Sequence, residues 1–200
     1  MKTLLTAMAL VLASGSSALA FDTATQAIID RHKANKPVSI TDIATLMQSS
    51  ERWCYLEEAG TCAWSDIYLE VTDSGAAFEI GNAWSETVDI AFIDSGTFRD
   101  GRYICEAGID WIPTVRAVRR ADGVMLLGRE LKALKTEIAA TRTDTVIDCF
   151  DYLYRSADAA NQTVTLLQRQ YTDDAYDPTK DTEVVLHFDP ANASALTWRW

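Results

Sequence analysis

Histidine is scarce in this sequence, and the spacing patterns of several common catalytic and metal sites are missing. Only two histidines occur among the 200 residues. No serine stands in a Gly-x-Ser-x-Gly turn, and neither His-x-x-x-His nor Cys-x-x-Cys is present. These absences argue against an α/β-type serine hydrolase, a helical zinc-protease site, a zinc ribbon and a thioredoxin-like redox centre.

Positive charge is also in short supply. The chain has 18 Lys and Arg against 29 Asp and Glu, a net charge of −11 at pH 7. Such an acidic surface repels phosphate backbones, so we expect no nucleic-acid partner. The basic residues are concentrated between residues 99 and 135, which predicts internal ion pairs with the acidic remainder of the chain.

Long apolar runs are absent beyond the N-terminus. Residues 1–20 combine Lys2, an apolar run over 4–13 and the small-x-small motif Ala-Leu-Ala at 18–20, the pattern of a cleavable signal peptide. The run is too short to cross a hydrocarbon layer of roughly 30 Å. We therefore expect an exported protein, periplasmic or extracellular, whose mature chain starts near Phe21 and has no membrane span. Loss of Lys2 leaves 17 basic against 29 acidic residues, a net charge of −12.

The four cysteines predict two disulfides, because an even count in an exported chain is typical of structural bridges. Three pairings are possible. Cys54 and Cys62 enclose a short loop with Gly60, so we favour a bridge between them, which leaves Cys105 to pair with Cys149. Each bridge is expected to contribute roughly 2–4 kcal/mol of stability.

Helical spacing of apolar residues marks three segments. The first covers about 23–34, and the second starts after a capping Ser39 or Thr41. The third, over 127–140, carries one apolar stripe that we expect to pack on the core. The stripe consists of Leu127, Leu131, Leu134 and Ile138.

From Trp53 onward the pattern changes to a period of two, which is typical of strands. Turn signals recur every 8–12 residues, including Asp-Ser-Gly at 73–75 and at 94–96, and Asp-Gly at 122–123. We expect a single α+β domain over 21–200, in which N-terminal helices and one central amphipathic helix pack on a mostly antiparallel meander sheet. The predicted strands are 63–71, 77–83, 87–93, 102–106, 114–120, 124–127, 145–155, 163–171 and 183–188.

One predicted strand carries a candidate binding strip. Strict alternation places Trp64, Asp66, Tyr68 and Glu70 on one face of the strand 63–71. Aromatic rings beside carboxylates are suited to a sugar or a cationic group. The same alternation also fits the solvent-facing side of a half-buried strand, which is the interpretation that the sequence favours.

Other polar groups are weaker candidates. Glu57 and Glu58 are neighbours and point to opposite faces of any strand, so we expect them to be solvated. His187 and Asp189 share a face if the last strand continues, but no nucleophile accompanies them. The acidic stretch 173–183 lacks the spacing of a calcium loop and is expected to be a solvated loop. We predict no metal site and no cofactor.

These observations favour a non-catalytic module that binds or regulates an unknown protein or glycan partner. Such a module is expected to have no deep polar cleft and no cluster of strongly shifted acids. The alternative is a small hydrolase or lyase acting on a carbohydrate or envelope polymer, with Asp66 and Glu70 transferring protons. A minor alternative is an outer-membrane β-barrel, which the four cysteines and the helices fit poorly. Sequons at Asn161 and Asn192 matter only if the source glycosylates exported proteins.

Overall fold

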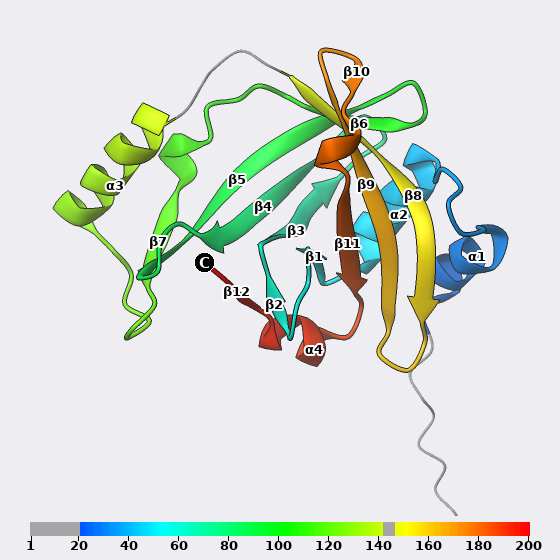
Figure 1. Cartoon of the computed structure of the whole chain (residues 1–200), viewed down its shortest axis with the longest axis horizontal. Helices are drawn as coiled ribbons and strands as arrows, with labels where there is room; N and C mark the ends of the chain where they lie inside the picture. Colours follow the sequence, from blue (N-terminus) through cyan, green and yellow to red (C-terminus); the bar gives the residue numbers. More distant parts are fainter. Residues whose placement is uncertain (1–20, 142–146) are drawn as a thin grey trace, which may run out of the picture.

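The computed structural model describes residues 21–141 and 147–200, and Figure 1 shows the arrangement of their helices and strands. The predicted signal peptide at residues 1–20 lies outside the described residues. None of the described helices is long and apolar enough to cross a membrane.

The helices begin where the sequence offers a capping side chain. The Asp22 carboxylate accepts hydrogen bonds from two backbone N–H groups of the first turn of α1, and the Ser39 hydroxyl accepts one from Asp42 at the start of α2. The helical elements are α1 (Thr23–Arg31), α2 (Ile40–Ser49), α3 (Gly128–Thr141) and α4 (Pro190–Ala195), with 3₁₀ turns at Ile112–Thr114 and Pro178–Lys180.

Ten strands of the described chain form the main sheet, and eight of them make up a barrel. The barrel strands are β1 (Arg52–Tyr55), β3 (Trp64–Val71), β4 (Gly75–Ala83), β5 (Val88–Arg99), β6 (Tyr103–Glu106), β8 (Asp148–Asp158), β9 (Thr163–Thr172) and β11 (Thr182–His187). The other two strands of this sheet are β7 (Arg116–Arg119), which pairs with β5, and β10 (Ala175–Tyr176), which pairs with β9. A separate two-stranded sheet consists of β2 (Thr61–Cys62) and β12 (Thr197–Trp198).

The sheet closes on itself, which corrects the expectation of an open meander. Each barrel strand pairs antiparallel with the next barrel strand along the chain, as a meander requires. However, β11 also pairs with β1, with Leu186 opposite Trp53, so the first and last barrel strands complete an eight-stranded barrel. Closure pairs the two edges that an open sheet would leave exposed.

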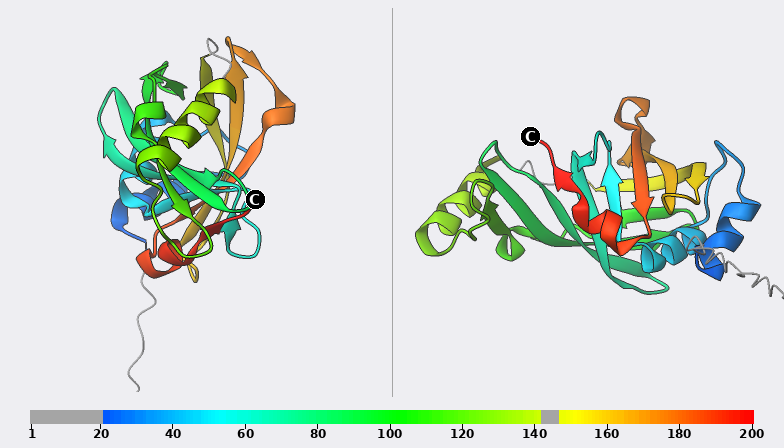
Figure 2. Two further views of the ribbon diagram at one scale, coloured as in Figure 1. Left: turned by 90° about the vertical axis from the view of Figure 1, so that its left-hand side faces the viewer. Right: turned by 90° about the horizontal axis from the view of Figure 1, so that it is seen from below.

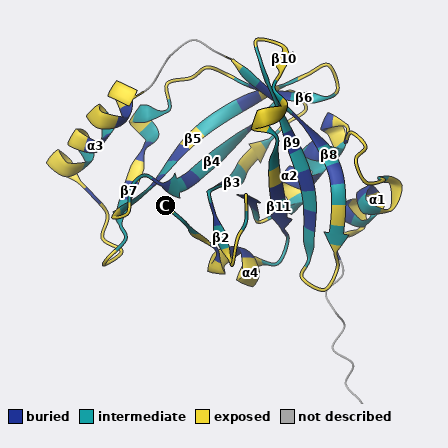
Figure 3. Cartoon of the chain, in the orientation of Figure 1, coloured by how far each residue is buried: buried dark blue, intermediate teal, exposed yellow. Residues whose placement is uncertain are grey.

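Two apolar clusters hold the helices to the barrel. Ile43 and Leu46 of α2 are fully buried in one cluster with inward-facing Trp53 and Leu186. Leu134 and Ile138 of α3 belong to the second cluster, which lies on β5 and β7, whereas Leu127 precedes the helix and is exposed. Figures 1 and 2 show α3 at one end of the molecule and α1 and α2 at the other. Figure 3 shows that the buried residues follow the strands.

Both predicted disulfides are present. Cys54 of β1 is bonded to Cys62 of β2, and Cys105 of β6 to Cys149 of β8. The second pair stands directly opposite in the antiparallel register of β6 and β8. The first bridge ties β2 to the barrel, and β2 pairs in parallel with the C-terminal strand β12.

The predicted turn at 94–96 is wrong, because these residues lie inside β5. That strand runs without interruption through Asp94 and Gly96 to Arg99, paired with β4 on one side. A side chain at Gly96 would collide with Ile104, since an added Cβ lies 2.5 Å from Cγ1 of that residue. The glycine is therefore needed for close packing between β5 and β6.

The predicted strand at 124–127 is also wrong. In this segment a single bridge joins Met125 to Val118.

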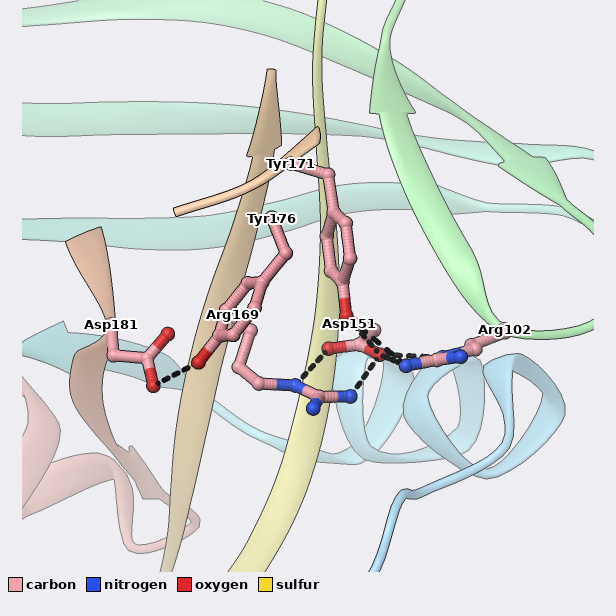
Figure 4. A network of polar contacts seen from close by, with 6 residues as sticks. All are labelled: Arg102, Asp151, Arg169, Tyr171, Tyr176 and Asp181. Carbon is pink, nitrogen blue, oxygen red and sulfur yellow. Dashed lines mark hydrogen bonds and ion pairs between the residues drawn. The ribbon is translucent and has the colours of Figure 1, made fainter. Parts of the chain in front are cut away.

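The predicted ion pairs between the basic segment and the acidic remainder are present at several places, including Arg116 with Glu79 and Arg120 with Asp89. The most buried of them is centred on Asp151, on the outer side of β8. Its carboxylate accepts hydrogen bonds from Arg169 Nε at 2.7 Å and Arg102 Nε at 2.5 Å. Figure 4 shows the two guanidinium groups on either side of it.

The C-terminal strand packs on the outside of the barrel at a glycine. The Trp198 ring lies over Gly81 of β4, and its indole N–H donates to the Ser65 hydroxyl at 3.0 Å. A Cβ at Gly81 would lie 2.3 Å from a ring carbon of Trp198. Only glycine leaves room for the ring in this position.

Gly81→Ala is therefore expected to displace the Trp198 ring and to lower the free energy of unfolding by about 1–3 kcal/mol, the usual cost of overpacking. Denaturant unfolding of the oxidised protein measures the change. Trp198→Ala removes the obstacle, so adding Gly81→Ala to that variant should cost little more. If Gly81→Ala lowered the free energy of unfolding equally in the wild-type protein and in Trp198→Ala, the alanine side chain would not be in contact with the Trp198 ring.

Candidate functional site: a cavity inside the barrel

The barrel contains a cavity of about 270 Å³, and each of the eight barrel strands contributes at least one lining residue. The apolar and aromatic lining consists of Tyr55, Trp64, Tyr68, Phe78, Ile80, Ile104, Phe150 and Tyr152. The remaining lining residues are Asp66, Asp94, Gly96, Glu106, Asp148, Gln168, Gln170 and Thr182. Among these described lining residues, four are acidic and none is basic.

Strand register explains why these side chains converge. Residues directly opposite each other in an antiparallel pair point to the same face. Tyr55 of β1 stands opposite Trp64 of β3, and Asp66 stands opposite Ile80 of β4. Trp64 and Asp66 lie two residues apart on β3, so all four side chains face the interior of the barrel.

Three of the four residues in the predicted binding strip line the cavity. Trp64, Asp66 and Tyr68 do so, which rules out the solvent-facing interpretation of this part of the strand. Glu70 does not line the cavity and is exposed. The register of β3 against β4 shifts between Tyr68 and Glu70, and the extra residue of this bulge is Leu69.

The bulge corrects the expectation that Asp66 and Glu70 share a face. A one-residue shift reverses which side each later side chain takes. Beyond the shift, Val71 packs against the main apolar cluster and Glu70 points away from it. The proposed proton-transfer pair of these two carboxylates therefore does not exist. The carboxylates that share the cavity with Asp66 are instead those of Asp94, Glu106 and Asp148, and the charge of Asp94 on β5 contributes to the raised pKa of Asp66.

A network of hydroxyl and amide groups supports Asp66. The Tyr55 hydroxyl donates to Oδ2 of Asp66 at 2.7 Å, and the Gln168 amide donates to the Tyr152 hydroxyl at 3.1 Å. Tyr55 and Tyr152 are about 1% exposed, so their positions are fixed by packing. Burial raises the pKa of both phenols, and they stay neutral at physiological pH.

The other carboxylate oxygen of Asp66 has no partner. Oδ1 is buried and makes no hydrogen bond within the described part of the chain. Burial, partly offset by the Tyr55 hydrogen bond and reinforced by the nearby charge of Asp94, raises the pKa of Asp66 from 3.8 to about 7. This carboxyl is consequently poised between its charged and neutral forms near pH 7. The non-catalytic hypothesis expects no deep polar cleft and no cluster of strongly shifted acids, and the cavity combines a partly polar lining with a strongly raised pKa at one acid, Asp66.

The structure places the other candidate groups away from the cavity. His187 is buried, and its Nε2 lies 2.7 Å from the carboxylate of Glu57. Asp189 caps α4 by accepting from Asn192 and is not paired with His187, because β11 ends at His187. Glu57, expected to be solvated, is thus the partner of the histidine. Across the described ranges, no group of three or more His, Cys, Asp or Glu side chains is placed to hold a metal ion.

Several lining residues escaped the sequence analysis. Tyr55 lies in a strand too short to show a period, and Gln168 is a polar residue in an otherwise apolar alternation. Phe150 and Tyr152 alternate on β8 and were detectable as one face, but nothing local shows that this face is opposite Asp66.

A comparison with family models, with curated proteins and with solved structures found no match to this chain, so its function has to be inferred from the cavity itself.

Proposed function

We propose that this protein is an exported binding module that holds a small organic molecule with an aromatic or otherwise flat apolar body inside its barrel. The observation that carries the proposal is the cavity, to which all eight barrel strands contribute lining residues, six of them aromatic. Small barrels have room for one small ligand. An apolar cavity of roughly 150 Å³ admits benzene, so about 270 Å³ is enough for a two-ring molecule.

The composition of the lining supports binding of this type. Ligand cavities are mostly apolar and carry a few polar groups that orient the ligand. The Tyr55 and Trp64 rings are stacked with their centroids 4.8 Å apart, and Asp66, Gln168 and Gln170 supply polar atoms nearby. Two disulfides fit the export that the N-terminal sequence predicts, because such bridges persist in oxidising compartments.

Saturable binding of a neutral dye, N-phenyl-1-naphthylamine, tests the proposal. Its fluorescence rises in apolar surroundings, and we expect a single site. Thr182 lines the cavity, and the adjacent Glu183 is exposed. Thr182→Trp should therefore raise the Kd for the dye at least tenfold. Glu183→Trp places the same side chain outside the barrel and should leave the Kd unchanged. Absence of saturable binding to the wild-type protein, or equal binding by both variants, would overturn the proposal.

A second candidate function, acid–base catalysis on a small substrate, is favoured by one observation. Asp66 is a buried acid with a pKa raised to about 7, and a second carboxylate, Asp94, lines the same cavity. General acid–base chemistry commonly uses two carboxyl groups in one site, one of which has its pKa raised by burial. We rank it second because the described lining residues include no histidine, cysteine, serine or lysine, and the cavity is too small for a polymer. Turnover of a ligand that is abolished by Asp66→Asn would reverse this ranking.

A further inference from the structure

We propose that the ligand carries a protonated amine, and that the unpartnered carboxylate oxygen of Asp66 together with the surrounding aromatic rings binds it. This inference rests on the proposed function, since it names the charged group of the molecule in the barrel. Its starting point is Asp66, which is 6% exposed, lines the cavity and has one oxygen held by Tyr55 and the other without a hydrogen bond in the described structure.

A buried carboxylate oxygen that accepts no hydrogen bond is stabilised when a hydrogen-bond donor binds to it. Leaving a charged oxygen unpaired in the interior is costly, and a donor that is itself charged offsets the most. Within the described residues the lining offers no Lys, Arg or His for this purpose. A cation brought by the ligand would be the missing partner, and Asp66 would then be stabilised in its ionised form.

The unpartnered oxygen distinguishes Asp66 from the other three carboxylates that line the cavity. The Asp148 carboxylate accepts from the Thr172 hydroxyl at 2.5 Å, and Oδ1 of Asp94 accepts from the backbone N–H of Ser95 at 2.7 Å. Glu106 also has a partner of its own. Asp66 is therefore the lining acid at which a direct ion pair with the ligand is expected.

The aromatic lining favours an organic ammonium over a metal ion. Ring faces attract cations, and alkylammonium groups are commonly bound between them. Tyr55 and Trp64 stack nearly parallel at 12°, and Tyr68 packs beside Phe78 with centroids 5.5 Å apart. Hard metal ions instead require six or more oxygen ligands. A flat ring system bearing a primary amine would place its body against these rings and its ammonium at Asp66.

Displacement of the bound dye by tryptamine and by tryptophol tests the inference. The two molecules share the same ring system and differ in an ammonium against a hydroxyl. At pH 8 we expect tryptamine to displace N-phenyl-1-naphthylamine at about 10- to 30-fold lower concentration, which corresponds to one charge-assisted contact with cation–π support. Asp66→Asn should remove this preference, while Glu183→Gln, which deletes one exposed acid, should keep it.

The outcomes separate the two proposals. If the dye does not bind at all, the proposed function fails. If the dye binds but tryptophol displaces it as well as tryptamine does, the cavity is real and the amine inference is wrong. The preference for tryptamine should shrink at pH 5, where Asp66 is protonated in the free protein, so a preference of the same size at pH 5 and at pH 8 would likewise contradict an ion pair with Asp66. Unchanged tryptamine preference in Asp66→Asn would assign the cation to another residue.

Discussion

Replacing Asp66 by asparagine is expected to make the folded protein more stable at pH 8 by up to about 4 kcal/mol, and to change its stability little at pH 4. The pKa of Asp66 rises from 3.8 to about 7 on folding, and each pKa unit corresponds to about 1.4 kcal/mol. Between these two values the folded protein binds a proton that the unfolded chain has released. Stability therefore falls as the pH rises from about 4 to about 7, and it levels off above that.

Asparagine mimics the neutral acid and removes this loss. Its amide oxygen can accept the hydrogen bond that Tyr55 donates to Asp66. The titratable groups that face Asp66 from neighbouring strands are Tyr55, Tyr152 and Asp94, together with Tyr68 on its own strand. The three tyrosines have raised pKa values and stay neutral over this range, whereas the charge of Asp94 contributes to the raised pKa of Asp66.

Denaturant unfolding of both proteins from pH 4 to pH 8 measures the effect. Subtracting the wild-type curve from that of Asp66→Asn cancels the titration of the remaining acids. The difference should grow with pH and level off above pH 7. A constant difference would mean that Asp66 does not titrate in this range, and a variant less stable at pH 8 would mean that its charge already has a partner.

Features set by neighbouring residues could be predicted from the sequence. The bridge between Cys54 and Cys62 follows from a short loop, and the start of α2 follows from the capping hydroxyl of Ser39. The strand 64–71 follows from alternation over eight residues. Each of these depends on contacts between residues close together in the chain, which a local pattern records.

Closure of the barrel could not be predicted, because it depends on pairing between distant segments. β1 is only four residues long, and its partner β11 lies at the other end of the chain. For the same reason, the Asp-Ser-Gly sequence at 94–96 predicts a turn although these residues lie inside β5. Gly96 stands in a strand because Ile104 of the neighbouring strand needs the space.

Only part of the candidate site could be predicted from the sequence, again because its position depends on pairing between distant segments. Alternation correctly groups Trp64, Asp66 and Tyr68, but it contains no information on which side is inside. Only closure of the sheet makes their face the interior. Alternation cannot reveal a bulge either. The single inserted residue turns Glu70 to the face opposite to the one that alternation predicts.

Replacing Asp151 by asparagine is expected to lower the free energy of unfolding by about 3 kcal/mol, towards the lower end of the range for breaking a buried ion pair. Asp151 is 0% exposed, and its two oxygens accept from both Arg169 and Arg102 (Figure 4). Asparagine keeps the size but removes the charge and presents an N–H group to a guanidinium. The side chains of Arg169 and Arg102 remain 18% and 39% exposed, so water partly compensates, which moderates the loss.

Asp181→Asn provides the matched control at the edge of the same network. Its carboxylate accepts a hydrogen bond from the Tyr176 hydroxyl at 2.8 Å, and Tyr176 is 43% exposed. Water can replace that contact, so the control should unfold at nearly the wild-type denaturant midpoint.

Asp151 lies on the outer side of β8 between Phe150 and Tyr152, both of which line the cavity. Because its loss should disturb the position of this strand, Asp151→Asn should also weaken dye binding. If Asp151→Asn were as stable as Asp181→Asn, the two arginines would contribute nothing beyond covering the outer side of the barrel.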